Sequence, residues 1–320
     1  SSDLDYHPSL ATCYHNMGSV YYRQQNLKEA LKHYQMALEI NLKHYGEVHP
    51  DVATGYNNIG NIYDAEGRMD QALKYYTKSL DIKRKIYGEN HNSMASTLNN
   101  IGSIYKAQMQ YQLALECFNK AYKIKKAQFG ANHPDLAVIM NNIGSIHELL
   151  GNLGKALDFF LKSLKIQISL FGEFHHSLID TYNSIGQIYF KQQKFDEAHK
   201  IYKLTLEIAS HHNQKNHYVA QTYLNLAETL YEQAKYAEAA DNYEKALDLS
   251  ISISPNDHSR ISTAQKKLAD AIEKSGNKLD VSKLGENRRT SIFATNLSIP
   301  QLSRINLSTS NLLSIPQLEK

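Results

Sequence analysis

The sequence is poor in the residues that mark several classes of protein. It has no Trp, two Cys and six Pro among 320 residues, and no run of 18 or so apolar residues. A membrane-spanning helix is therefore not predicted, and no charged segment followed by an apolar one opens the chain as a secretion signal would. The two cysteines, Cys13 and Cys117, show no C-x-x-C or metal-ligand spacing. We expect no disulfide framework and no structural metal.

Charge of one sign is also lacking. Lys and Arg number 35 against 32 Asp and Glu, for a net charge of +3, and no basic block is present. A nucleic-acid partner is therefore not predicted. Without a leader or membrane segment, we expect a cytoplasmic protein. The chain starts at Ser1 rather than Met, a few residues before His7-Pro8, and we expect a fragment whose upstream region has been removed.

The sequence does contain a repeat of 42 residues. Gly60 has counterparts at that spacing at Gly18, Gly102, Gly144 and Gly186, and a fixed period in this range is typical of a repeat array. Within a unit, apolar residues recur at helical spacing twice. In the second unit we predict one helix over about 51–66, a turn at Gly67-Arg68 and a second helix over about 70–87 that ends at Gly88.

The linking loop YGEVHPD at 45–51 returns as YGENHNS, FGANHPD and FGEFHHS. Its glycine can adopt a positive φ and end the second helix, and its proline suits the first turn of the next helix. The residue after the proline position has a short side-chain oxygen that could accept hydrogen bonds from the free amides of the helix start. These predicted caps are Ser9, Asp51, Ser93, Asp135 and Ser177.

Small residues at Gly60, Ala72 and Ser79, with aromatic residues at Tyr63 and Tyr76, resemble the tetratricopeptide repeat. The 42-residue period and the GExHPD-like loop resemble more narrowly the repeats of kinesin light chains. The resemblance implies an all-α, right-handed superhelical solenoid of antiparallel helix pairs. We expect this solenoid over residues 1–276, with pairs at about 9–46, 51–88, 93–130, 135–172, 177–212 and 217–254 and a capping helix at about 259–274.

The pattern stops after Gly276. Residues 277–320 are rich in Ser and Asn, and we expect a tail that is at least partly disordered. The tail contains the segment SIPQL twice, at 298–302 and 314–318, and such apolar residues need a surface to dock on. It also contains Arg288-Arg289-Thr290-Ser291-Ile292, which resembles the acceptor site of basophilic kinases, so we predict phosphorylation at Ser291.

The position two before the helix glycine is the main candidate for binding. In the resembled fold it lines a concave groove, where an amide can bond the backbone of an extended peptide. The candidates are Asn16, Asn58, Asn100, Asn142 and Asn225, while the fifth repeat has Ser184. A second interpretation, that these amides join adjacent repeats, stays open. It applies also to the preceding residues Asn57, Asn99, Asn141 and Asn183.

One class of groove ligand is disfavoured. Tetratricopeptide domains that clamp a C-terminal carboxylate have a Lys one helical turn before such an Asn. Here that position holds Thr12, Thr54, Ser96, Val138, Asp180 and Gln221. A chaperone-tail ligand is therefore not expected.

No catalytic or cofactor motif is found: G-x-G-x-x-G, the P-loop, G-x-S-x-G and H-E-x-x-H are all missing. Histidines recur at the repeat spacing, but neighbouring repeats lie on the order of 10 Å apart, too far to share a metal ion. The adjacent pairs His175-His176 and His211-His212 have no further ligands at suitable spacing. We predict no catalytic residue, no metal, no cofactor and no small-molecule substrate.

The function that follows is a non-enzymatic scaffold binding an extended segment of a partner protein. The resemblance implies cargo adaptation in microtubule transport, although the heptad region that binds the motor chain in that family is not in this sequence. Two alternatives stay open. The chain could be the substrate-recruiting arm of a larger signalling enzyme, or a scaffold autoinhibited when its own SIPQL segments dock in the groove.

Overall fold

The computed structural model describes residues 7–212 and 214–276, and all regular structure in these ranges is helical. The first four pairs are α1 (Pro8–Arg23) and α2 (Leu27–Tyr45), α3 (Pro50–Ala65) and α4 (Met69–Tyr87), α5 (Ala95–Ala107) and α6 (Tyr111–Phe129), and α7 (Pro134–Leu149) and α8 (Leu153–Phe171). They are followed by α9 (Leu178–Lys191) and α10 (Phe195–His211), α11 (His217–Glu232) and α12 (Tyr236–Ile253), and α13 (His258–Lys274). The all-α prediction is confirmed. The predicted tail, both SIPQL segments and Ser291 lie outside the described residues.

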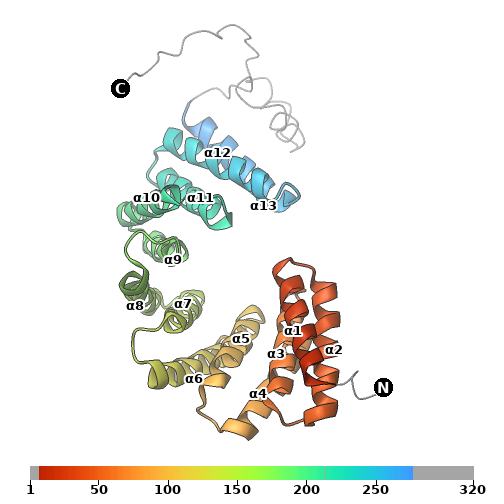
Figure 1. The fold of residues 1–320 in the computed structure, drawn as a ribbon. Helices are drawn as coiled ribbons and strands as arrows, with labels where there is room; N and C mark the ends of the chain where they lie inside the picture. Colours follow the sequence, from red (N-terminus) through yellow and green to blue (C-terminus); the bar gives the residue numbers. More distant parts are fainter. Residues whose placement is uncertain (1–6, 213, 277–320) are drawn as a thin grey trace. The chain divides into compact units, whose positions relative to one another are not determined.

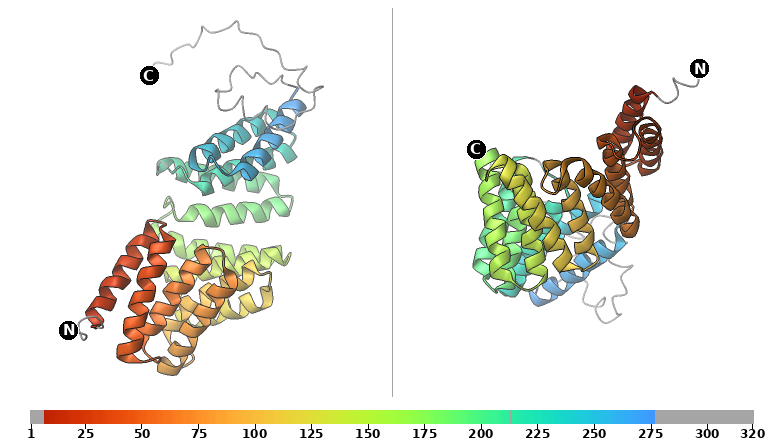
Figure 2. Two further views of the ribbon diagram at one scale, coloured as in Figure 1. Left: turned by 90° about the vertical axis from the view of Figure 1, so that its right-hand side faces the viewer. Right: turned by 90° about the horizontal axis from the view of Figure 1, so that it is seen from below.

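The helices fall into two compact units, Ser1–Gly172 with α1 to α8 and Glu173–Lys320 with α9 to α13 (Figure 1). In each unit, successive helices pack as antiparallel hairpins (Figure 2). In the first unit, α1, α3, α5 and α7 lie on one side of the helical layer and their partners on the other. That residues 1–276 form one continuous solenoid stays a proposal. In the described part of the chain, no helix has the length and apolar character needed to cross a membrane.

The turn within each pair has one hydrogen-bonding pattern. The amide of Arg68 donates to the carbonyl of Tyr63 at 2.8 Å, and Gly67 between them has a φ of 72°. Met109 takes the same place with a φ of 59°. This bond satisfies a carbonyl that the end of the helix leaves free. The same bond and a positive φ recur at Gln25, Gly151, Gln193 and Ala234.

The helix starts correct the prediction about the caps. The cap is the histidine before the proline position, not the Ser or Asp after it: His49 Nδ1 accepts from the amide of Asp51 at 3.2 Å. Asp51 already lies inside α3, whereas His49 is extended and its ring can reach back to the free amide. The same cap forms at His7, His91, His133 and His175. Three of the rings also stack on the last aromatic of the preceding helix, as His49 does on Tyr45.

Two helices whose loop lacks the proline start late. Asn92 and His176 hold the proline position there, whereas His217 holds it before α11, which starts at that residue. A 3₁₀ turn, η1 (Asn92–Met94), then precedes α5, and α9 starts only at Leu178. Proline favours this position because its fixed φ suits a helix and its missing amide costs no hydrogen bond there.

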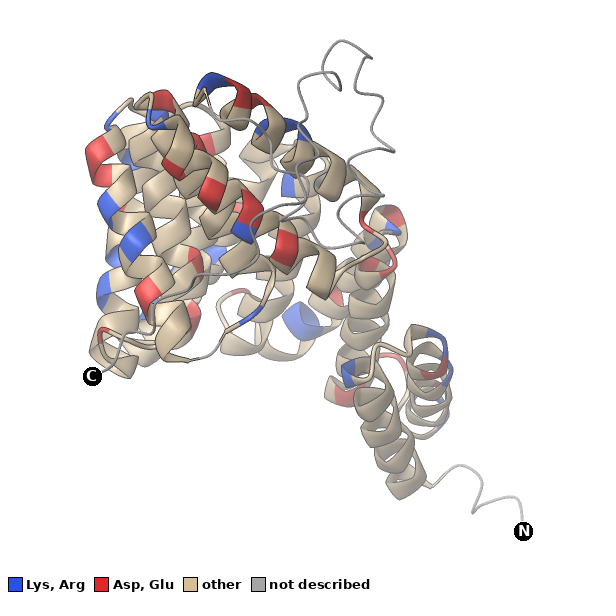
Figure 3. Ribbon diagram, turned by 90° about the horizontal axis from the view of Figure 1, so that it is seen from above, with Lys and Arg blue, Asp and Glu red and all other residues tan. Residues whose placement is uncertain are grey.

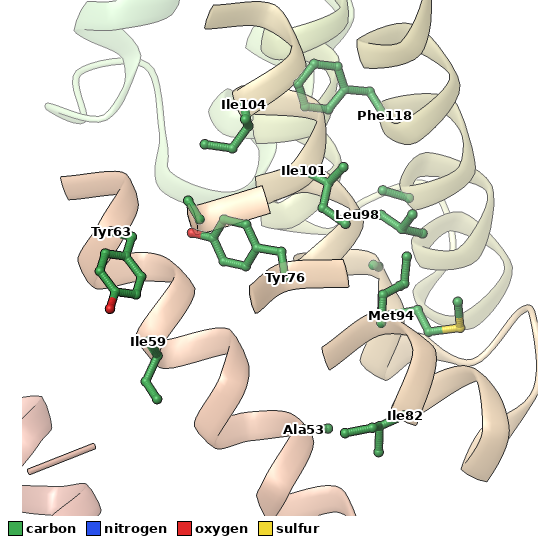
Figure 4. Packing of buried hydrophobic residues seen from close by; sticks show 14 of the residues in the cluster. Ala53, Ile59, Tyr63, Tyr76, Ile82, Met94, Leu98, Ile101, Ile104 and Phe118 are labelled. Atoms are coloured by element: carbon green, nitrogen blue, oxygen red, sulfur yellow. The ribbon is translucent and has the colours of Figure 1, made fainter. Parts of the chain in front are cut away.

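Small and large residues alternate in the core as predicted. The six alanines at the Ala72 position are fully buried, and the aromatics at the Tyr76 position are buried with them. A Cβ added to Gly60 would lie 2.7 Å from Tyr76 Cδ1, so the ring rests directly on the α3 backbone. The core continues between repeats, where Leu98, Ile101 and Ile104 of α5 join Tyr76 in one cluster (Figure 4).

Candidate functional site

Four of the five predicted asparagines lie together in the first unit. Asn16, Asn58, Asn100 and Asn142 occupy one position on α1, α3, α5 and α7, and we call them the amide row. Asn16 is exposed and the other three are half-buried. Asn225 lies on α11 in the second unit. The candidate site described below is therefore the amide row.

The amide row is tied to its own scaffold. Three of its four amides donate to the preceding repeat: Asn58 to His15 Nδ1 at 3.4 Å, Asn100 to Asn61 Oδ1 at 3.1 Å and Asn142 to Asn99 Oδ1 at 2.9 Å. Each side-chain amide carries two N–H donors and an oxygen with two acceptor sites, so one bond does not saturate it. These contacts orient the amides and leave them capacity for a ligand.

The residues preceding the amide row hold neighbouring repeats together. Asn57 Oδ1 accepts from Thr97 Oγ1 of the next repeat at 2.9 Å. In the second unit, Asn183 Oδ1 accepts from Thr222 Oγ1 at 2.8 Å, and Asn183 Nδ2 donates to the carbonyl of Tyr218 at 3.2 Å. Both threonines are fully buried. Asn183 is itself buried and bonded at both ends, and such side chains fix the register between repeats.

A polar cluster supports the middle of the amide row. Asn61 Oδ1 accepts from Asn100 Nδ2 and also from the hydroxyl of Tyr76 at 2.8 Å. Burial raises the pKa of the Tyr76 hydroxyl, which therefore remains a donor at neutral pH. Burial also raises the pKa of the neighbouring Asp64 carboxyl. Burial thus acts against the charged form of both groups beneath this part of the row.

Three of the four positions one turn before the row bear short hydroxyls, and the fourth is the exposed Val138. Thr12 and Thr54 are exposed, and each donates its hydroxyl hydrogen to a carbonyl one turn back, at 3.3 and 3.0 Å. The oxygen lone pairs remain for an incoming donor. On the described helices, Lys and Arg are interspersed with Asp and Glu (Figure 3). The row therefore offers neutral hydrogen-bonding groups rather than a field of one sign.

The second unit differs at the same positions. Ser184 Oγ donates to the carbonyl of Asp180 at 3.1 Å, and Asn225 Oδ1 accepts from Gln221 Nε2 at 2.9 Å. Both bonds stay within one helix. On α13, Lys267 occupies the corresponding place and pairs with Glu228. An unbroken row of amides is thus a property of the first unit.

Histidines gather at the start of the second unit. The rings of His175, His176 and His212 have centroids 4.3 to 6.3 Å apart. His175 Nδ1 serves as a helix cap, and burial together with the neighbouring His176 and His212 lowers the pKa of His175. Over residues 7–212 and 214–276, no three His, Cys, Asp or Glu side chains are placed to hold a metal ion.

Sequence reasoning missed two sets of residues. The capping histidines could have been found, because they recur in phase with the helix starts. The buried Lys83, which bonds Thr97 between repeats, has a weaker signal, since Lys125 shares its position but Asn41 and Gln167 occupy it in other repeats.

Comparison with family models matches the tetratricopeptide repeat over most of the chain, at residues 10–51, 51–127, 93–169, 135–211 and 219–260. The chain belongs to the tetratricopeptide repeat family. A comparison with curated proteins found no match.

Solved structures of tetratricopeptide proteins share the fold. BtubC (BKLC) from P. vanneervenii is 17% identical with a TM-score of 0.61, covering 71% of this chain and 91% of its own. A putative kinesin light chain from Podosopora anserina with nearly identical TPR-like repeats is 18% identical with a TM-score of 0.55, covering 65% and 99%. A Rap protein complexed with competence and sporulation factor is 18% identical with a TM-score of 0.57, covering 82% and 75%. At these identities the likeness shows the fold alone.

Proposed function

We propose that this protein is a non-enzymatic scaffold whose amide row binds an extended segment of a partner protein. The observation that carries the proposal is the row itself, in which four amides recur at one position on successive first helices of a single unit. An extended chain rises about 3.3 Å per residue, so one repeat of about 10 Å faces three ligand residues. Each amide can then meet the ligand backbone once per repeat.

The inter-repeat bonds support this function rather than compete with it. A side chain held by a neighbour loses less rotamer freedom when it binds, so its hydrogen bonds to a ligand cost less entropy. The neutral character of the row favours recognition of backbone over a charged terminus. This fits a partner segment that lies along the helices and not a C-terminal carboxylate.

A finer version of the proposal is a cytoplasmic cargo adaptor similar to kinesin light chains. It is supported by the period and loop of the repeats and by the fold shared with a putative kinesin light chain. The Rap protein, which shares the fold, was solved in complex with competence and sporulation factor.

The test separates binding by the row from its structural role. Peptides selected by display on the full chain would be titrated, by fluorescence anisotropy, against the wild type and Asn16→Ala. Asn16 is exposed, so its loss should leave repeat stacking intact. We expect affinity to fall about tenfold if one amide makes two bonds to the ligand.

Asn57→Ala is the matched control, because Asn57 joins repeats from the adjacent position. It should lower stability and leave affinity within about twofold, and Asn142→Ala should lower both. Peptides that bind Asn16→Ala and Asn142→Ala as tightly as the wild type would show that the row is purely architectural. Binding would then lie on another face.

A further inference from the structure

One side of α1 has an apolar stripe that is exposed over most of its length, with only Leu10 packed near α2. Leu10, Cys13, Met17 and Val20 follow one another at spacings of three, four and three residues, so they share one helix face. Met17 is 44% exposed and Val20 is 52% exposed, Cys13 is exposed and Leu10 is half-buried. This stripe is distinct from the amide row.

The same positions are buried in every later first helix. The counterparts of Met17 are Ile59, Ile101, Ile143, Ile185 and Leu226, and those of Val20 are Ile62, Ile104, Ile146, Ile188 and Thr229. Cys13 corresponds to Gly55, Thr97, Ile139, Thr181 and Thr222, which are also buried. The stripe is therefore the first-helix half of the stacking interface that joins the repeats.

The repeat that covers α3 shows what such a partner must present. A Cβ on Gly55 would lie 3.1 Å from Leu38 Cδ1, so Leu38 of α2 packs directly on the Cys13 counterpart. Tyr21 and Leu31, from α1 and α2, join Ile59 and Ile62 in the same cluster. The cluster that contains Ile59 and Ile62 thus includes side chains from both helices of the preceding pair.

The last helix ends the stack in a different way. The counterparts of the stripe on α13 are Ile261, Ala264, Leu268 and Ala271, all buried against the preceding pair. The outward residues of α13 are Ser262, Thr263, Lys266, Asp270, Glu273 and Lys274, all exposed. A polar outer face is how a repeat array is terminated in water. No comparable polar face protects the stripe on α1.

We propose that the α1 stripe is a stacking interface for one further antiparallel helix pair of the same repeat type. The incoming pair lies in register one repeat before α1, and its second helix places an apolar side chain, equivalent to Leu38, over Cys13. The proposal rests on the continuity of this interface with the one that covers α3, α5 and α7. It is independent of any ligand on the amide row.

The test adds a helix pair before α1 and measures how fast Cys13 is labelled. A second copy of residues 8–49, carrying Cys13→Ser, would be inserted between His7 and Pro8, which keeps both the period and the His-Pro junction. All chains carry Cys117→Ala, although burial already raises the pKa of the Cys117 thiol to about 11 and slows its reaction. We expect maleimide labelling of Cys13 to slow by about tenfold or more relative to the chain without the insertion.

A control insertion with Leu38→Asp in the added copy should leave the maleimide labelling of Cys13 fast, because a carboxylate cannot be buried there unpaired. Equal labelling of the two insertions would overturn the proposal, whether or not the added copy is helical by circular dichroism. Labelling of the chain without an insertion could contradict the proposal in two further ways. Protection of Cys13 that grows with protein concentration would identify a second copy as the occupant, and protection lost on removal of residues 277–320 would identify the tail.

Discussion

Lys83 Nζ donates to Thr97 Oγ1 at 2.7 Å inside the packed interface between the second and third repeats. Thr97 Oγ1 in turn donates to Asn57 Oδ1 at 2.9 Å, so one chain of hydrogen bonds joins α4, α5 and α3. Lys83 is 9% exposed, and burial lowers the pKa of its ammonium group to about 8. A neutral amine can still donate to Thr97, so the chain of bonds does not depend on charge.

This buried lysine should make stability rise with pH. Between pH 8 and 10.5 the folded chain has lost the Lys83 proton while the unfolded chain still binds it, so the free energy of unfolding increases over that window. The full increment is on the order of 3 kcal/mol. Urea unfolding at pH 7, 8.5 and 10 should show this gain for the wild type relative to Lys83→Met, in which the site has no proton to lose. If the free energy of unfolding changed with pH in the same way for both proteins, the prediction would be contradicted.

The helices could be predicted from the sequence because the same local pattern recurs in each repeat. Two features recur with the period: Gly60 lies opposite Tyr76, and Ala72 lies between the helices of a pair. Together they allow the two helices to pack closely in only one arrangement. The contacts of the amide row could not be predicted in this way. Whether Asn58 reaches His15, or Asn57 reaches Thr97, depends on the tilt and register between repeats, which no local pattern encodes.

The helix caps show a second limit. Both His49 and Asp51 can accept from a free amide, and the sequence alone does not decide between them. The outcome depends on where α3 begins, and a shift of one or two residues changes which side chain is the cap. The helices after Asn92 and His176 show the same dependence, since α5 and α9 start later in their repeats than α3 and α7 do.

Gly60→Ala should destabilise the first unit. The new Cβ would lie 2.7 Å from two carbons of the Tyr76 ring, and that ring is buried and cannot move aside without disturbing its neighbours. We expect a loss of about 1 to 3 kcal/mol in the free energy of unfolding. Gly154→Ala on α8 is the control, because its Cβ meets nothing within 4 Å. It should gain about 0.5 kcal/mol, and equal losses for both variants would argue against the close contact.

Removing a histidine cap should weaken one helix start. His91→Ala removes the Nδ1 acceptor that lies 3.2 Å from the amide nitrogen of Ser93. It also removes the ring that stacks on Tyr87, so the free energy of unfolding should fall by about 1 kcal/mol. His91→Asn, with a short acceptor suited to capping, should recover most of the loss. Hydrogen exchange of the η1 and α5 amides measures the effect locally. Unchanged exchange in His91→Ala would show that the imidazole contributes nothing as a cap.

Met109→Gly should stabilise the protein. Met109 has a φ of 59°, which is costly for a residue with a Cβ, while Gly67 and Gly151 occupy the same turn position without that cost. Met109 is also 75% exposed, so little buried apolar surface is lost with its side chain. The gain should be about 1 kcal/mol, seen as a higher midpoint in urea unfolding, and Gly67→Ala should lose a similar amount. If Met109→Gly lowered the midpoint, the side chain would have to make a stabilising contact that outweighs the backbone strain.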